Sequence, residues 1–158
     1  DLFIHELSDI YSAEKQLTKA LPRLARAAEN PDLAAAFETH LEETQGQIER
    51  IDQVVEVLGI RLKRIKCAAM EGLVEEGKEV IDSVDKGPVR DAALIGGAQK
   101  VEHYEIASYG TIAALAKQLG YKDALPLLLE TLEEEKATDE KLTLLAKGGG
   151  NAKAAQAA

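Results

Sequence analysis

The chain has 158 residues, which is the size of one ordinary domain with one hydrophobic core. Hydrophobic residues make up 46% of it and charged residues 30%, so it is neither disordered nor membrane-embedded, and no apolar run reaches the ~20 residues of a membrane-spanning helix. The formal net charge of -9 argues against nucleic acid as a partner, and the single cysteine, Cys67, excludes an internal disulfide and favours a reducing, cytoplasmic compartment.

The first long helix is predicted over residues 1–29. Its apolar residues recur at alternating steps of three and four, the spacing of a buried face in a helical bundle. They are Leu7, Ile10, Leu17, Leu21 and Leu24. One member of this stripe, Glu14, is charged, and Pro22 should kink the helix or separate its last turn.

The second long helix is predicted over residues 32–58, and its inward face is apolar at the ends and polar in the middle. Asn30 or Asp32 can cap its start, and Gly59 is a suitable stop. The inward positions are Leu33, Phe37, His40 or Leu41, Glu43 or Thr44, Gln47 or Ile48, Ile51, Val54 and Leu58.

The connection that follows, residues 60–87, contains a shorter amphipathic helix over residues 67–84. Beyond it, long helices are predicted over residues 89–119 and 122–147. Their inward positions are Ala92, Ile95, Gln99, Glu102, Glu105, Tyr109, Ile112, Ala116 and Leu119, and then Leu128, Leu132, Glu135, Asp139, Leu142 and Leu145. Three glycines end the last helix, and residues 148–158 are expected to form a flexible tail without a large apolar side chain.

The lengths of the connections predict the topology. Short turns join the first and second helices and the third and fourth, so each pair should form an antiparallel hairpin. The connection of about 28 residues between the hairpins can run back along the bundle, so the second and third helices can be parallel. We therefore expect an all-α fold, a ferritin-like four-helix bundle over residues 1–147 with one long crossover that contains the shorter helix.

A short internal repeat supports two related hairpins. Residues 37–43 align without gaps on residues 129–135 at an offset of 92, which places Glu43 over Glu135. In each antiparallel hairpin, residues equally far from the turn lie at the same depth. Glu14 and Glu43 should therefore lie level with each other, as should the Glu102/Glu105 pair with Glu135 and Asp139, and His40 lies one turn from Glu43.

Several carboxylates in one buried layer repel each other unless protons or cations neutralise them. Carboxylates and an imidazole that face inward from four helices suit two adjacent iron or manganese ions. The open alternatives are buried salt bridges in a non-enzymatic structural or regulatory bundle that acts through dimerisation or partner binding, and a storage cage. The sequence assigns no residue a catalytic role.

Five segments carry a resemblance to a known family. They are A-E-K-Q-L (13–17), A-F-E-T-H-L-E-E-T (36–44), K-C-A-A-M-E-G-L (66–73), Q-K-V-E-H-Y-E-I-A-S-Y-G-T (99–111) and the acidic segment 132–141. Together they resemble the bacterial YciF-like family of ferritin-like stress-response proteins. The resemblance implies a cytoplasmic, dimeric, ferritin-like bundle linked to stress responses.

More distantly, the layout resembles rubrerythrin, in which two helices supply glutamates and the other two each supply Glu-x-x-His. Glu102-x-x-Glu105 fits that arrangement, but His40 precedes Glu43 instead of following it, and the last helix has no histidine. We therefore expect an oxygen-rich iron or manganese site. The metal ligands we predict are Glu14, His40, Glu43, Glu102, Glu105, Glu135 and Asp139.

Overall fold

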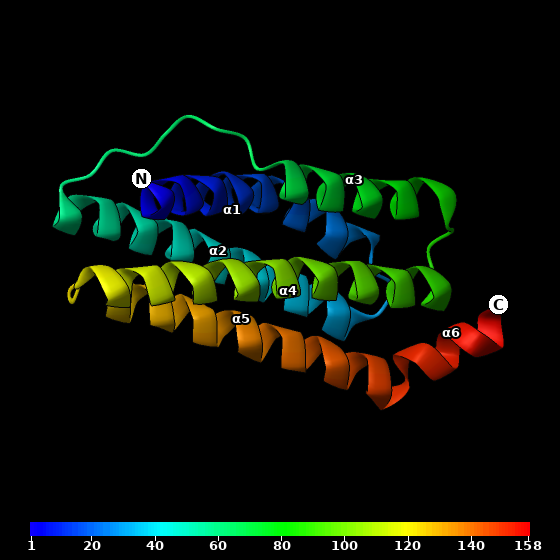
Figure 1. The fold of residues 1–158 in the computed structure, drawn as a ribbon. Coiled ribbons are helices and arrows are strands. Elements are labelled where there is room, and N and C mark those ends of the chain that lie inside the picture. Colours follow the sequence, from blue (N-terminus) through cyan, green and yellow to red (C-terminus); the bar gives the residue numbers. More distant parts are fainter.

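Helices account for nearly all of residues 1–158 in the computed structural model of the chain (Figure 1). The four long ones are α1 (Leu2–Ala27), α2 (Pro31–Leu58), α4 (Pro88–Leu119) and α5 (Leu125–Leu145). The shorter α3 (Ala68–Ser83) lies in the connection between the two hairpins, and η1 (Ala146–Gly150) and α6 (Asn151–Ala157) end the chain. The prediction of an all-α protein with a helix in the long connection is confirmed.

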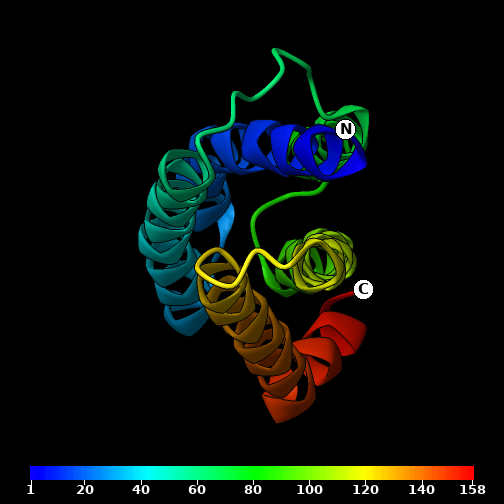
Figure 2. The ribbon, with the colours of Figure 1, turned by 60° about the vertical axis from the view of Figure 1, so that its left-hand side comes forward.

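The four long helices surround one core (Figure 2). Helices α1 and α5 each pack against both α2 and α4, and α3 packs on the outside against α1 and α4. Figure 1 shows that α2 and α4 run in the same direction, because the connection and α3 carry the chain back along the bundle. None of the helices is both long enough and apolar enough to cross a membrane.

Most residues of the predicted stripes are buried. Leu7, Ile10, Ile51 and Ile112 are at most 1% exposed and fill the core between its polar centre and the turn that joins α4 to α5. Leu119 differs from its prediction and is 53% exposed, because it is the last residue of α4, where the bundle ends. Pro22 does not separate a last turn from α1, which continues to Ala27.

A row of polar side chains on α1 holds the extended segment before α3. Ser8, Ser12 and Gln16 follow each other at steps of four and therefore lie on one face of α1. Ser8 accepts a hydrogen bond from the backbone N–H of Lys63 (2.9 Å), Ser12 accepts one from Cys67 (2.9 Å), and Gln16 donates to the Cys67 carbonyl (3.1 Å). These contacts fix where the chain crosses from α2 to α3.

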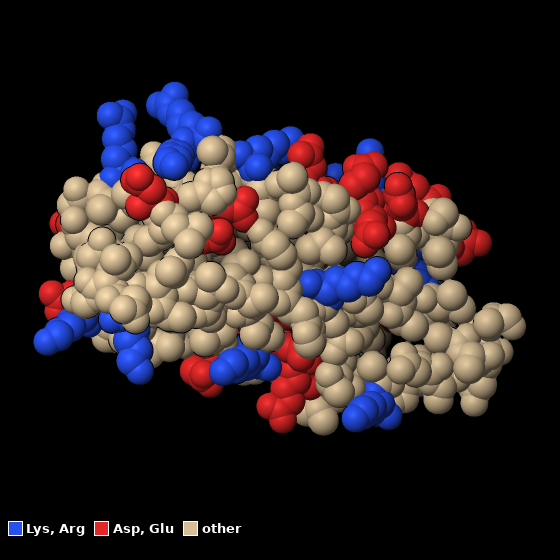
Figure 3. Space-filling view, in the orientation of Figure 1, with Lys and Arg blue, Asp and Glu red and all other residues tan.

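The same segment exposes a run of basic side chains, Arg61, Lys63, Arg64 and Lys66. Figure 3 shows Lys and Arg gathered at the upper left, where this segment runs, and Asp and Glu at the upper right, over α3. One ion pair joins the two regions, between Lys66 Nζ and Glu71 Oε1 at 2.7 Å. The basic run is therefore local, next to an acidic helix.

Asp91 ties the start of α4 to the turn between α1 and α2. This buried carboxylate accepts hydrogen bonds from the backbone N–H groups of Glu29 and Asn30, each at 2.8 Å. The Asn30 side chain in turn caps α2 by accepting a hydrogen bond from the N–H of Asp32, at 2.9 Å. A buried carboxylate that receives two backbone donors fixes the relative position of three helices.

We expect Asp91→Ala to lower the free energy of unfolding by about 2–3 kcal/mol, because two backbone N–H groups lose their charged acceptor. Urea denaturation followed by circular dichroism measures this change. Asp82→Ala, at an exposed site in α3, is the matched control and should shift the free energy of unfolding by less than about 0.5 kcal/mol. Equal effects of the two substitutions would contradict the role of Asp91.

The end of the chain is helical, although an irregular tail was expected after Lys147. The turn of η1 contains Gly149 at a φ of 125°, a conformation that favours glycine, and α6 follows it alongside α4. Neither η1 nor α6 contains a buried residue. The flexibility of residues 148–158 stays a prediction.

Because α6 buries no side chain, deleting residues 151–158 should move the thermal midpoint by no more than ~2 °C. Amide hydrogens of this segment should also exchange faster than those of α5. Leu142→Ala, at a residue that is 3% exposed, is the positive control and should cost about 2–5 kcal/mol. A large loss of stability on deletion of the tail would show that α6 is part of the bundle.

Candidate metal centre

Five ionisable side chains meet halfway along the bundle, and each long helix contributes at least one. They are Glu14 from α1, His40 from α2, Glu102 and Glu105 from α4, and Glu135 from α5. All five are at most 5% exposed. Four of the inward carboxylates predicted at one depth are therefore buried together with His40 in the core.

Helical spacing explains why these side chains point inward. Glu14 lies four residues after Ile10 and three before Leu17, so it takes the place of an apolar residue in the stripe of α1. Glu102 and Glu105 are three apart and share the inner face of α4 with Tyr109. The apolar residues on either side bury the helix face, and the acids are buried with it.

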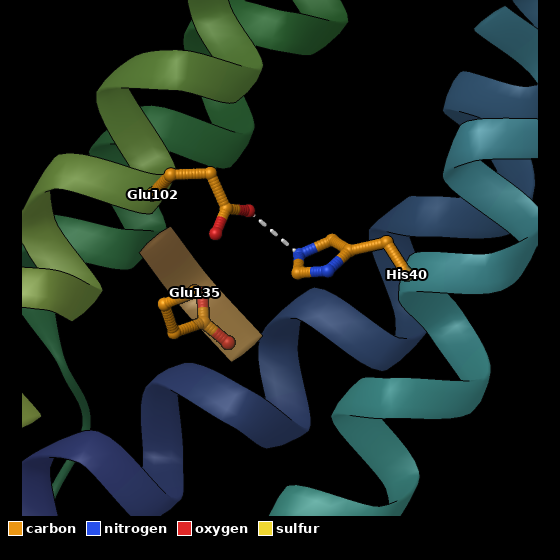
Figure 4. A group of neighbouring side chains, drawn as sticks. All are labelled: His40, Glu102 and Glu135. Atoms are coloured by element: carbon orange, nitrogen blue, oxygen red, sulfur yellow. Dashed lines mark ion pairs between the residues drawn. The ribbon is translucent and has the colours of Figure 1, made fainter. Parts of the chain in front are cut away.

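His40, Glu102 and Glu135 form the tightest group in the layer (Figure 4). Each offers one potential ligand atom, and these atoms lie within 4.8 Å of one another. His40 Nε2 is 2.8 Å from Glu102 Oε1, although its direction is poor for a hydrogen bond. Figure 4 shows Glu135 directed from α5 toward the space beside this pair. A cation there would contact ligands from three helices.

The remaining carboxylates complete the layer. Glu14 lies next to Glu105, and Glu135 lies next to Glu102. Both oxygens of Glu14, Glu105 and Glu135 are buried without a hydrogen-bond partner. A buried polar atom without a partner costs about 1–3 kcal/mol, and a carboxylate costs more. The layer therefore lowers the stability of the folded protein unless protons or cations neutralise it.

Burial makes these carboxyl groups hold their protons. It raises the pKa of Glu14 to about 7. Burial, and then the charges of Glu135 and Glu14, raise the pKa of Glu105 well above its usual range. Burial and the contact with Glu102 do the same for the pKa of Glu135. Without a cation, protons neutralise much of the layer.

Burial has the opposite effect on the imidazole of His40, because the charged form of this side chain is the protonated one. Burial by itself disfavours the charged ring, but the contacts with Glu102 and Glu43 outweigh it and raise the pKa of His40 well above its usual value. A metal ion binds the neutral imidazole and ionised carboxylates. Metal binding must therefore displace protons from both kinds of group.

Glu43 and Asp139, the other two predicted ligands, lie at the edge of the layer. Glu43 is 34% exposed, accepts a hydrogen bond from Thr138 Oγ1 (3.1 Å), and lies 3.8 Å from His40 Nδ1. Asp139 is 22% exposed and faces the exposed His103, with 3.2 Å between Asp139 Oδ1 and His103 Nε2. The structure thus places Glu43 beside the metal-binding histidine candidate and turns Asp139 away toward the surface.

Sequence reasoning missed a polar network on the other side of the layer. Arg50 binds Glu134 through two nitrogens, at 2.6 and 2.9 Å, and Gln47 donates to Glu134 at 3.2 Å. Gln47, one of the predicted inward positions, is fully buried, and its amide contacts Glu134. A signal for this network exists in the sequence, because Arg50 is the only Lys or Arg in α2 and follows Gln47 by three residues.

Tyr104 and Cys67 belong to a separate contact outside the layer. The Tyr104 hydroxyl donates to Asp9 (2.5 Å) and lies 3.1 Å from Cys67 Sγ. The hydroxyl of Tyr109, in contrast, is buried without a hydrogen-bond partner. Burial raises the pKa of Tyr109, and the nearby charges of Glu14 and Glu105 raise it further. Tyr109 is therefore the tyrosine that borders the layer.

Fold and site together define a helical bundle with a buried histidine–carboxylate cluster in its core. The chain belongs to the family described as Domain of unknown function (DUF892), whose family model matches residues 1–155. It is 68% identical over 155 residues to Protein YciF of Escherichia coli K12, a match that covers 98% of this chain and 93% of that protein. The resemblance to the YciF-like family is confirmed.

Solved structures agree with this assignment. The crystal structure of the E. coli stress protein YciF matches with a TM-score of 0.93 at 68% identity, over 96% of each chain. YcfI of Rhodopseudomonas palustris, which has been suggested to be a structural protein, matches with a TM-score of 0.86 at 49% identity over 90% of this chain and 91% of that one. A protein of Xanthomonas campestris matches at 22% identity with a TM-score of 0.71, over 95% and 89% of the two chains, and shares the fold.

Proposed function

We propose that this chain is a ferritin-like metal protein of the bacterial stress response, with two iron or manganese ions held in the carboxylate layer. The observation that carries the proposal is the group of buried carboxylate oxygens without partners on Glu14, Glu105 and Glu135. A structural bundle gains nothing from such groups, whereas a bound cation would pair them. The parallel course of α2 and α4 supports the ferritin-like topology.

The donor set fits a pair of divalent cations. Glu14, Glu102, Glu105 and Glu135, once ionised, balance the charge of two such ions, and His40 remains neutral. Carboxylate oxygens with one imidazole favour iron or manganese over the softer metals. Two ions in this position would supply reversible electron transfer to dioxygen or peroxide.

The chain's own residues prepare the site. Apolar side chains above and below the layer exclude water from it, and Tyr109 leaves a buried hydroxyl free to bond a ligand oxygen. Glu43 holds one side of the His40 ring and is itself held by Thr138. Asp139 would join the site only if its side chain turned inward.

A second candidate is a structural bundle without metal, which the suggestion made for YcfI favours. In that case the acids would be neutralised by protons, and the protein would act through dimerisation or partner binding. A homodimer and a cytoplasmic location remain proposals for either function. Metal content separates the two functions.

The test is the metal content of the protein purified without chelator and then loaded with Fe²⁺ or Mn²⁺. We expect about two ions per chain, as in carboxylate sites of helical bundles. Glu14→Ala and Glu135→Ala should each lose at least one of them, while Glu140→Ala, at an exposed site, should lose none. Failure to load either metal in stoichiometric amount would leave the structural bundle as the function.

A further inference from the structure

An apolar pocket reaches the metal-centre candidate at His40 and Glu102. It has a volume of about 100 Å³ and lies between the carboxylate layer and the turn that joins α1 to α2. His40 and Glu102 line it, together with Glu43, whereas Glu14, Glu105 and Glu135 do not. This pocket therefore contacts the part of the layer that contains His40 and Glu102.

Apolar side chains from all four long helices make up most of the wall. Those deepest in the core are Leu17, Leu21, Ala36, Phe37, Val101 and Leu142, which are nearly fully buried. The mouth lies between α2 and α5, where the lining residues Thr39, Ala137 and Lys141 are exposed. The hydrogen bond from Thr138 to Glu43 spans these two helices beside the mouth.

Size and polarity narrow the class of ligand. An apolar cavity of ~150 Å³ in a protein core stays dry and binds benzene or xenon. The smaller pocket here suits a molecule of only a few heavy atoms, and the apolar side chains that make up most of its wall disfavour large polar substrates. At the inner end, Glu102 Oε2 and His40 Nδ1 are buried without a hydrogen-bond partner.

We infer that this pocket is the access route and holding site for dioxygen on its way to a metal position at His40 and Glu102. The inference rests on the proposed metal function for its chemistry. Binding of a small apolar molecule in the pocket does not depend on metal, so it can be measured separately.

Xenon serves as the probe in the metal-free protein. Crystals under xenon pressure should show a xenon atom between Leu17 and Phe37, two of the residues that line the pocket. Ala36→Leu, which adds a side chain to the wall, should lower xenon occupancy about tenfold or more. Ala107→Leu makes the same change at an exposed site on α4 and should leave the occupancy unchanged.

The second measurement is the rate at which bound Fe²⁺ is oxidised by dioxygen. Ala36→Leu should slow this rate about tenfold at unchanged iron content, and Ala107→Leu should not. Ala137 lines the exposed mouth, so Ala137→Leu should block the pocket without changing the buried core. It should therefore also slow the oxidation of Fe²⁺.

The outcomes separate the two proposals. An absence of xenon from the pocket overturns the access route, as does an oxidation rate that neither filling variant changes. A protein that binds xenon but no metal overturns the metal function and removes the chemistry of the route. A protein that binds metal and shows equal oxidation rates in all variants retains the function and loses the route.

Discussion

Glu14→Gln should raise the free energy of unfolding of the metal-free protein at pH 8 by about 1–3 kcal/mol. The wild-type side chain is ionised in both the folded and the unfolded chain at pH 8, because this pH lies above the pKa of about 7 that Glu14 has in the folded protein. Glutamine keeps the shape and removes the buried charge. Urea denaturation in the presence of a chelator measures the change.

The pH dependence of this effect distinguishes charge from packing. At pH 4 the carboxyl group is protonated in both states, so Glu14→Gln should have almost no effect there. Glu42→Gln, at an exposed site on α2, is the control and should be neutral at both pH values. If Glu14→Gln destabilised the protein equally at pH 4 and pH 8, Glu14 would have a structural role and no cost of charge.

In the metal-free protein, the free energy of unfolding should fall as the pH rises from 4.5 to 8. The folded protein holds the Glu14 proton up to a pKa of about 7, whereas the unfolded chain releases it near 4.5, so folding takes up protons between these values. Each such proton changes the stability by at most about 1.4 kcal/mol per pH unit.

The other buried groups act in the same direction. Glu105 and Glu135 also have raised pKa values, so their contribution is present at low pH and is lost as the pH rises through those values. The pKa of His40 is also raised, so its contribution to stability likewise decreases as the pH rises above 6.5, the pKa of histidine in the unfolded chain. Glu43 has a lowered pKa and acts only below 4.5, where its contribution is lost as the pH falls.

Denaturation midpoints at pH 5, 6, 7 and 8 with a chelator test this prediction. Saturating Mn²⁺ should reverse the slope, because the metal binds deprotonated ligands and therefore binds more tightly as the pH rises. If the free energy of unfolding of the metal-free protein instead rose steadily from pH 5 to pH 8, the prediction would be wrong. The carboxyl groups of the layer would then be ionised and paired with positive charges, contrary to the structure.

The sequence by itself determined the helices and the depth of the site. Helical periodicity and short turns are local properties, so they placed α1, α2, α4 and α5 within a few residues of their bounds. Matching depth in two hairpins predicted one layer with Glu14, Glu102, Glu105 and Glu135, since a charge in an apolar stripe is buried with the stripe. The same argument also placed Glu43 and Asp139 there, and His40 was added through its spacing from Glu43.

Only the tertiary structure decided which side chains face each other. Glu43 and Asp139 occupy helix positions near the inner face, but the packing of α2 against α5 leaves both partly exposed. The internal repeat that supported Glu43 as a ligand carries no information about how far each helix is rotated toward the core. The Arg50–Glu134 pair and the pocket beside His40 depend on how two or more helices pack. Such contacts arise from the relative rotation of helices, which the spacing within one helix does not fix.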